Sequence, residues 1–299
     1  MKVLVFGASG YIGHEVALAF VRAGHDVFGA TRALYDYKKL EYEEITPLIC
    51  DFLSPSEYRH LIPQMDAVVD VSGGEDEEEL GPTIFQATME ESNKARANGP
   101  PLSYIYCSGS WVHGGSIAEA LSDRSPITKP VPISDWRAAF EDKVTSSISK
   151  SLTVNIIRPG MVYGGTSSVI DYLLFASAKQ GQIEWYGQED TVMPTVHDQD
   201  LGEAFRLTAE KAYIVPGITF DICNPHSEPL SVILARLKTV SHAKSIALKQ
   251  PETALEEALA CSATLKPQLA KSLLGWEAKK PTLADGIARY YTAYLASLP

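Results

Sequence analysis

The segment MKVLVFGASGYIG, residues 1–13, constrains the fold of this chain more than any other part of the sequence. Residues 2–6 are an apolar run that predicts a buried parallel strand, and residues 11–23 carry the periodicity of a helix that stops at Gly24. Three glycines spaced G-x-x-G-x-x-G lie between them. Without side chains, the backbone turns tightly and a pyrophosphate can approach the N–H groups at the helix start. The segment therefore predicts a dinucleotide-binding turn made by Gly7, Ser9, Gly10, Tyr11, Ile12 and Gly13.

Composition and charge limit the class of protein. The 299 residues are 45% hydrophobic, which is enough for a large core. The formal net charge is −11 and no basic cluster is visible in the sequence, so we do not expect a nucleic-acid partner. The seven histidines and four cysteines form no C-x-x-C or H-E-x-x-H pattern, so we expect neither a metal site nor a disulfide. No run reaches the roughly 18 apolar residues of a membrane span, and we expect a cytoplasmic protein with a small-molecule substrate.

Strand-like and helical segments alternate through the first half of the chain. Strands are predicted at residues 27–30, 47–50, 66–71, 103–107 and 153–157, and helices at residues 54–60, 82–97 and 134–149. This alternation predicts an α/β fold, a Rossmann-type doubly wound parallel sheet over residues 1–164. Residues 165–299 predict helices at 169–179, 199–211, 230–241 and 282–298, and we expect them to form a smaller C-terminal substrate lobe partly interleaved with the sheet.

In a doubly wound sheet the ligand lies at the carboxyl ends of the strands, so the residues that follow each strand are candidates for the site. The first of these is Arg32, which suits the 2′-phosphate of NADP better than the ribose hydroxyls of NAD, although NAD stays possible. Further candidates at this edge are Asp51, Phe52, Ser72 and Gly73. The acidic run at residues 75–79 is expected to be a solvated loop near the same edge.

Several short motifs occur in a consistent order after the glycine turn. They are Ser108 and Ser110 after the fifth predicted strand, Lys143 in the next helix, R-P-G-M-V-Y-G at 158–164, V-H-D-Q-D-L at 196–201 and L-G-W at 274–276. Over nearly the whole chain they resemble the extended short-chain dehydrogenase/reductases, the nucleoside-diphosphate-sugar epimerase/dehydratase-like proteins. The resemblance implies an NAD(P) cofactor, with Pro159 and Gly160 against the nicotinamide ring, and homodimers are common in that family.

The sequence departs from that family at its catalytic residues. The family uses a Tyr four residues before a Lys that holds the nicotinamide ribose, and here Ala139 stands four residues before Lys143. The resemblance still implies a cofactor role for Lys143, which shares an apolar helical stripe with Phe140. The family's serine run S-S-x-x-V-Y-G reads S-G-S-W-V-H-G here, which leaves Ser108, Ser110 and His113 as candidate catalytic residues.

Three functions fit these observations. The first is an NADP-dependent oxidoreductase that acts on a small organic carbonyl or activated alkene, since some short-chain reductases that resemble the isoflavone-reductase group work with a lysine and no tyrosine. The second is a non-catalytic NAD(P)-binding redox sensor or regulator that resembles the NmrA-like proteins. The third is a sugar-nucleotide epimerase or dehydratase, which is disfavoured because that reaction depends on the missing phenol.

Overall fold

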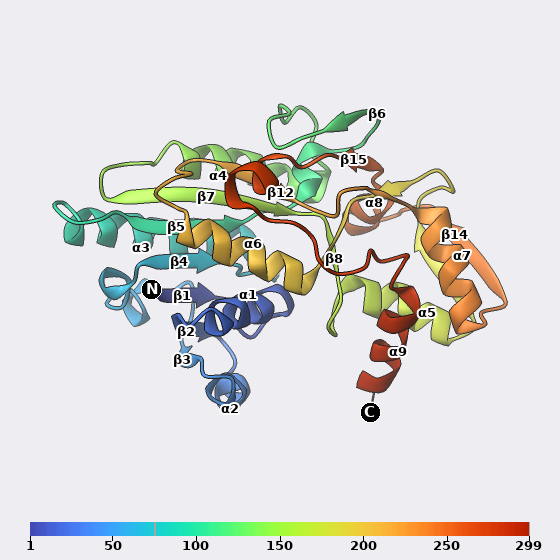
Figure 1. The fold of residues 1–299 in the computed structure, drawn as a ribbon, viewed down its shortest axis with the longest axis horizontal. Helices are drawn as coiled ribbons and strands as arrows, with labels where there is room; N and C mark the ends of the chain where they lie inside the picture. Colours follow the sequence, from blue (N-terminus) through green and yellow to red (C-terminus); the bar gives the residue numbers. More distant parts are fainter. Residues whose placement is uncertain (75, 299) are drawn as a thin grey trace.

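The computed structural model describes residues 1–74 and 76–298 and is built around a parallel sheet of seven strands (Figure 1). In spatial order the strands are β12 (Thr219–Ile222), β7 (Leu152–Pro159), β5 (Leu102–Cys107), β4 (Ala67–Asp70), β1 (Lys2–Phe6), β2 (Asp26–Thr31) and β3 (Thr46–Ile49). The chain starts at β1, runs outward to β3 and then returns to β4 on the other side of β1. Because the strand order reverses between β1 and β4, a crevice for a ligand is expected at their carboxyl ends.

Helices cover both faces of the sheet, as the strand alternation predicted. The helices of these layers are α1 (Tyr11–Arg22), α3 (Glu77–Ala95), α4 (Asp135–Thr145) and α6 (Asp198–Glu210). Alternate side chains of β1 enter two separate cores: Val3 and Val5 pack with α1 and α6, whereas Leu4 and Phe6 pack with α3 and α4. The burial of Val3, Leu4, Val5 and Phe6, all of β1 except the exposed Lys2, follows from this packing on both faces. The fold is thus the doubly wound α/β fold that the sequence indicates.

The remaining elements gather mainly beyond the carboxyl ends of the strands, on the right in Figure 1. The strands are β6 (Ser116–Leu121), β8 (Met161–Tyr163), β9 (Gln182–Tyr186), β10 (Val192–Met193), β11 (Thr195–His197), β13 (Glu228–Pro229), β14 (Ser245–Lys249) and β15 (Ala263–Leu265). The helices are α2 (Tyr37–Tyr42), which lies beside β3, and α5 (Ala176–Lys179), α7 (Leu230–Ser241), α8 (Ala254–Ala260) and α9 (Ile287–Ser297). Single 3₁₀ turns are η1 (Leu34–Asp36), η2 (Pro55–Glu57), η3 (Ile62–Gln64), η4 (Ser110–His113) and η5 (Pro132–Ser134), and π-helical turns are η6 (Ile170–Phe175) and η7 (Ala270–Leu274).

The second half of the chain both completes the sheet and forms a lobe of its own. Strand β12 extends the sheet beside β7, and α6 packs against α1. A third apolar core joins η6, α7 and α9 around the buried Trp185 of β9. Within the described residues, no helix is long and apolar enough to cross a membrane.

Two sequence predictions of local structure are corrected by the fold. The helix expected at residues 54–60 is only the single turn η2. In the loop before it, the Asp51 carboxylate accepts a hydrogen bond from the N–H of Leu53 at 3.0 Å. Helix α3 begins at Glu77 rather than at residue 82, so Glu77, Glu78 and Glu79 form its first turn, where the helix dipole favours acidic side chains. Glu75, the first residue of the acidic run, lies outside the described residues.

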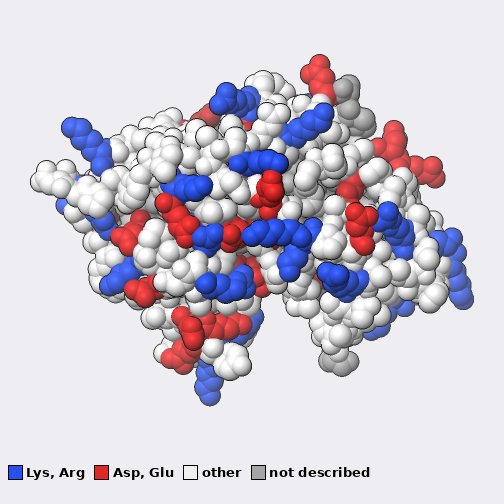
Figure 2. Space-filling view, viewed as in Figure 1, with Lys and Arg blue, Asp and Glu red and all other residues white. Residues whose placement is uncertain are grey.

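The surface in the same view mixes charges of both signs, with Lys and Arg among Asp and Glu side chains (Figure 2). On α6, Arg206 pairs with Glu203 at 2.5 Å and with Glu210 at 2.5 Å. A notch at the lower edge of this face separates α2 from α9 (Figure 2), where a cavity of about 470 Å³ has Lys39 and Ala293 in its wall. The notch marks where the sheet domain and the C-terminal lobe face each other.

Candidate cofactor and substrate site

The turn between β1 and α1 has a geometry that requires glycine at two positions. Gly7 has a φ of +82°, which side chains disfavour, and a Cβ there would lie 2.7 Å from the carbonyl oxygen of Val71. A Cβ on Gly13 would lie 2.0 Å from the carbonyl oxygen of Gly7. Gly10 is the N-cap of α1, and its backbone is extended. The first turn of α1 is therefore held against the strand end, with its N–H groups left without helical partners.

A cavity of about 520 Å³ lies in front of this turn and fits a nucleotide. It is lined by Gly7, Ser9, Gly10, Tyr11, Ile12, Gly13, Thr31, Arg32, Ala33, Tyr35, Asp36, Phe52, Val71 and Gly73. The free N–H groups of a helix start attract phosphate oxygens, and the bare glycines let the phosphates come close. The sequence had indicated nine of these residues. The other five lie at or after strand ends and belong to no recognisable motif: Thr31, Ala33, Tyr35, Asp36 and Val71.

Arg32 stands at the rim of this cavity. Its Nη2 donates to the carbonyl oxygen of Gly73 at 3.2 Å, and its guanidinium carbon lies 5.7 Å from the centroid of the Phe52 ring. Nη1 is 3.9 Å from the carboxylate of Asp76, and the side chain is 45% exposed. The guanidinium is thus held at the cavity by weak contacts and keeps N–H donors free for an anionic group.

Asp51 and Ser72, which the sequence had also indicated, do not line the cavity. The Asp51 carboxylate accepts from the hydroxyl of Ser54 at 3.2 Å as well as from the N–H of Leu53. The Ser72 hydroxyl donates to the carboxylate of Asp70 at 2.6 Å. Both side chains are engaged in capping their own turns, and the neighbouring Phe52 and Gly73 face the cavity in their place.

A second cavity of about 250 Å³ adjoins the first, and both have Tyr11 and Ile12 in their walls. Its other lining residues are Ser108, Gly109, Ser110, Trp111, Ser134, Arg137, Pro159, Gly160, Met161, Val162, Ser167 and Val169. The carboxyl ends of β5 and β7 thus bring together the two serines and the Pro-Gly pair that the sequence singled out. This is the arrangement expected for residues that follow neighbouring parallel strands.

Ser108 carries the most informative side chain of this second cavity. The residue is only 7% exposed, and its Oγ has no hydrogen-bond partner among the described residues. A buried hydroxyl without a partner costs about 1–3 kcal/mol. Ser110, 8% exposed, lines the same cavity on the other side of Gly109. The Oγ itself has almost no accessible surface, so an oxygen of a bound ligand would become its partner once the hydroxyl rotates into the cavity.

Tyr11 contributes a phenol to this region, but its proton is already engaged. The hydroxyl donates to the carbonyl oxygen of Gly164 at 2.8 Å. Burial raises the pKa of Tyr11 well above its usual value, and the nearby carboxylates of Asp198 and Asp171 raise it further. Tyr11 therefore stays protonated and ties the turn to the loop after β8, and does not replace the family's catalytic tyrosine.

The structure does not bring Lys143 to either cavity. Lys143 is exposed on α4 and lines a separate surface hollow with Arg59 and Glu90. The reason is the rotation of α4, which buries Phe140 and Val144 and turns the neighbouring Lys143 outward. Lys143 therefore does not lie with the other residues that the sequence assigned to the cofactor.

The cation that α4 does present to the second cavity is Arg137. Its Nη1 donates to the hydroxyl of Tyr106 at 2.6 Å, and its Nη2 pairs with Glu77 at 2.7 Å. The guanidinium also lies 4.6 Å from the ring of Trp136. Four residues before Arg137 stands Ile133, so this register also lacks a tyrosine. The sequence motif did not indicate Arg137, because the family motif contains a lysine at this point. An arginine side chain also carries a positive charge.

His113 is placed away from both cavities. Its Nε2 lies 3.0 Å from each carboxylate oxygen of Asp221, and both side chains are fully buried. Arg158 lies 4.0 Å from the same carboxylate and forms a two-point pair with the buried Glu141. His113 therefore belongs to a buried cluster with Asp221 and Arg158, and it does not line either cavity as a catalytic role would require.

The glycine turn, the switch in strand order and the two adjoining cavities define a nucleotide-binding protein of the Rossmann class. The model of the NAD dependent epimerase/dehydratase family matches residues 3–223, and the chain belongs to that family. The fold and family that the sequence indicated are thus confirmed.

Known proteins similar to this chain agree with that family. An uncharacterized protein of Schizosaccharomyces pombe is 25% identical over 71% of this chain and 71% of its own. A 2-alkyl-3-oxoalkanoate reductase of Stenotrophomonas maltophilia is 23% identical over 73% of this chain and 67% of its own. The crystal structure of dTDP-glucose 4,6-dehydratase from Bacillus anthracis in complex with NAD superimposes with a TM-score of 0.84, at 15% identity, over 99% of this chain and 97% of that one.

Proposed function

We propose that this protein is an NADP-dependent reductase of a small organic carbonyl compound. The observation that carries the proposal is Ser108, which lines the cavity that adjoins the glycine turn and whose buried hydroxyl has no partner in the described part of the chain. A carbonyl oxygen is the acceptor that such a hydroxyl requires. The relative named 2-alkyl-3-oxoalkanoate reductase supports a carbonyl substrate.

Individual residues of the second cavity have separate roles in such a reaction. NADPH, when bound, supplies the hydride. Ser108 donates a hydrogen bond to the carbonyl oxygen and stabilises the charge that develops there, with Ser110 as a second donor. Arg137 adds a positive potential on the same side, and Pro159, which has no N–H, gives an apolar wall for a flat ring. The oxygen takes its proton from water.

The test begins with binding and proceeds to turnover. Purified protein is titrated with NADPH and NADH, and NADPH oxidation is then followed with a panel of aldehydes, ketones and 3-oxo acids. We expect NADPH to bind more tightly than NADH and at least one carbonyl compound to be reduced. Tight NADPH binding without turnover on any compound would contradict the proposal and favour a redox sensor.

The coenzyme preference is predicted to depend on Arg32. We expect Arg32→Ser to weaken NADPH binding about 10- to 100-fold, because a charge-assisted contact contributes about 1.5–3 kcal/mol. NADH binding should change by less than about threefold, since NADH lacks the 2′-phosphate. Calorimetric titration of both coenzymes measures the two values. An equal loss for both coenzymes would show that Arg32 acts only on the shape of the rim.

Arg137 and Lys143 form a matched pair on the same helix. We expect Arg137→Met to lower kcat/KM for carbonyl reduction about tenfold or more, since the positive charge at the cavity is lost. Lys143→Met removes an exposed cation from a separate hollow and should leave kcat/KM unchanged. Steady-state kinetics and melting temperatures of both variants are compared. A loss of activity in Lys143→Met with Arg137→Met unaffected would reverse the assignment.

A further inference from the structure

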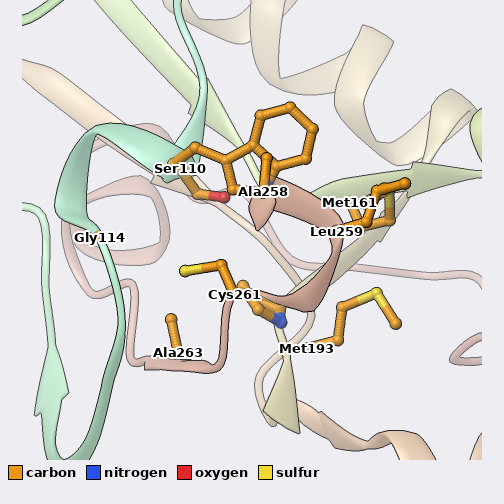
Figure 3. Close-up of a pocket in the computed structure, with 10 residues that line it drawn as sticks. Ser110, Gly114, Met161, Met193, Ala258, Leu259, Cys261 and Ala263 are labelled. Carbon is orange, nitrogen blue, oxygen red and sulfur yellow. The ribbon is translucent and has the colours of Figure 1, made fainter. Parts of the chain in front are cut away.

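A small cavity lies behind the candidate substrate site, and its volume is about 20 Å³ (Figure 3). Its wall comes from η4, β8, β10, α8 and the segment that leads into β15. The lining residues are Ser110, Trp111, Gly114, Met161, Met193, Pro194, Ala258, Leu259, Cys261 and Ala263. None of them carries a formal charge, and the Ser110 hydroxyl and the two Met side chains are seen around the hollow in Figure 3.

This small cavity adjoins the 250 Å³ cavity that contains Ser108. Ser110, Trp111 and Met161 line both, so the two spaces meet at these three residues. Ser110 therefore lies where the small cavity meets the 250 Å³ cavity. A ketone whose oxygen is held at the two serines would direct one of its two substituents toward the small cavity.

Size and chemistry define what the small cavity takes. Holding one water molecule requires roughly 10–15 Å³ of such volume, so there is room for a group of one or two carbon atoms. Methionine sulfurs and aliphatic side chains offer a water few hydrogen bonds, and burial raises the pKa of Cys261, which keeps its thiol neutral. A cavity whose wall is mostly but not wholly apolar has room for a methyl or ethyl group in place of water.

We propose that the small cavity is the subsite for the short alkyl substituent of an unsymmetrical ketone. The larger substituent lies in the 250 Å³ cavity, beside Arg137 and Val169. Arg137 is the charged residue in that lining and is already paired with Glu77 at 2.7 Å, so the cavity offers little positive charge to an anionic substituent. The substrate class is therefore a methyl or ethyl ketone with an apolar body, and not a nucleoside diphosphate sugar, whose two phosphate charges would need more donors.

The inference rests on the proposed reductase function and adds no new co-reactant. A C–H bond forms at the carbonyl carbon with the hydride of NADPH, the C–O π bond breaks, and the oxygen takes a proton from water. The ketone is reduced to a secondary alcohol and NADPH is oxidised to NADP⁺. Because the two substituents enter different cavities, the hydride reaches a single face and one enantiomer of the alcohol is expected.

The experiment compares three probes that share one larger substituent: an aldehyde, its methyl ketone and its butyl ketone. In the unmodified protein we expect kcat/KM for the methyl ketone to exceed that for the butyl ketone by about tenfold or more. Cys261→Leu fills the small cavity, and the methyl ketone should lose about tenfold or more while the aldehyde, which has only hydrogen at this side, keeps its rate. Retained aldehyde turnover shows that the variant is folded.

Met193→Ala enlarges the same cavity and provides the opposite test. We expect the butyl ketone to gain on the methyl ketone by about tenfold. Ketone-to-aldehyde ratios that are unchanged in both variants would overturn the subsite while leaving the reductase function intact. Absence of NADPH oxidation with every carbonyl compound in the unmodified protein would overturn the function and, with it, the subsite.

Discussion

Replacement of Ser108 by alanine is expected to lower kcat for carbonyl reduction about 10²- to 10³-fold and to leave NADPH affinity unchanged. The loss is large because a hydrogen-bond donor aimed at a developing oxyanion acts mainly in the transition state. The hydroxyl of Ser108 lies buried beside the cavity and has no partner among residues 1–74 and 76–298, so rotating it toward a ligand breaks no hydrogen bond described there. Steady-state kinetics with the best carbonyl compound of the panel and an NADPH titration measure both values.

Ser103 provides the matched control for this prediction. It lies on the same strand, β5, is 2% exposed and also has an unpaired Oγ among the described residues, but it does not line the cavity. Ser103→Ala should therefore keep kcat within about twofold, because replacing a buried unpaired hydroxyl by a methyl group removes no interaction. Equal activity of the Ser108→Ala and unmodified proteins would remove Ser108 from the reaction.

Replacement of Arg158 by methionine is expected to destabilise the fold by about 3–5 kcal/mol. Arg158 pairs with Glu141 and approaches Asp221, and these side chains are at most 7% exposed. Removing the cation leaves two carboxylates and the ring of His113 in a buried space without a compensating charge. Urea unfolding followed by circular dichroism measures the change in the free energy of unfolding.

Arg206 on α6 serves as the surface comparison. It also pairs with two carboxylates, those of Glu203 and Glu210, but at the edge of the molecule, where all three side chains have access to water. Arg206→Met should therefore cost about 1 kcal/mol or less. A similar small loss in Arg158→Met would mean that the buried cluster contributes little to stability.

The glycine turn and the alternation of strands and helices were predictable because they depend on local properties. Tight turning at Gly7, the close approach of α1 at Gly13 and the double burial of β1 are each encoded within a few residues. Ser108 and Pro159 were predictable for a related reason. Residues that follow parallel strands share one edge of the sheet, whatever the rest of the chain does.

The cation at the site was not predictable in this way. Whether Arg137 or Lys143 reaches the cavity depends on the rotation of α4 about its axis, which Phe140 and Val144 set by packing into the sheet. His113 is a similar case, since its partner Asp221 stands 108 positions away in the sequence. The small cavity behind Ser110 depends on Met193 and Cys261, which no local pattern connects to β5.

The sequence by itself therefore determined the fold class, the nucleotide-binding turn and the edge of the sheet where the site lies. Only the tertiary structure decided that Arg137 and not Lys143 lines the second cavity, that His113 lies outside it and which residues of the C-terminal lobe line the cavities. The physical reason is the range of the interactions. Backbone turns and strand periodicity depend on neighbours in the chain, whereas the lining of a cavity depends on side-chain packing between segments that are far apart in the sequence.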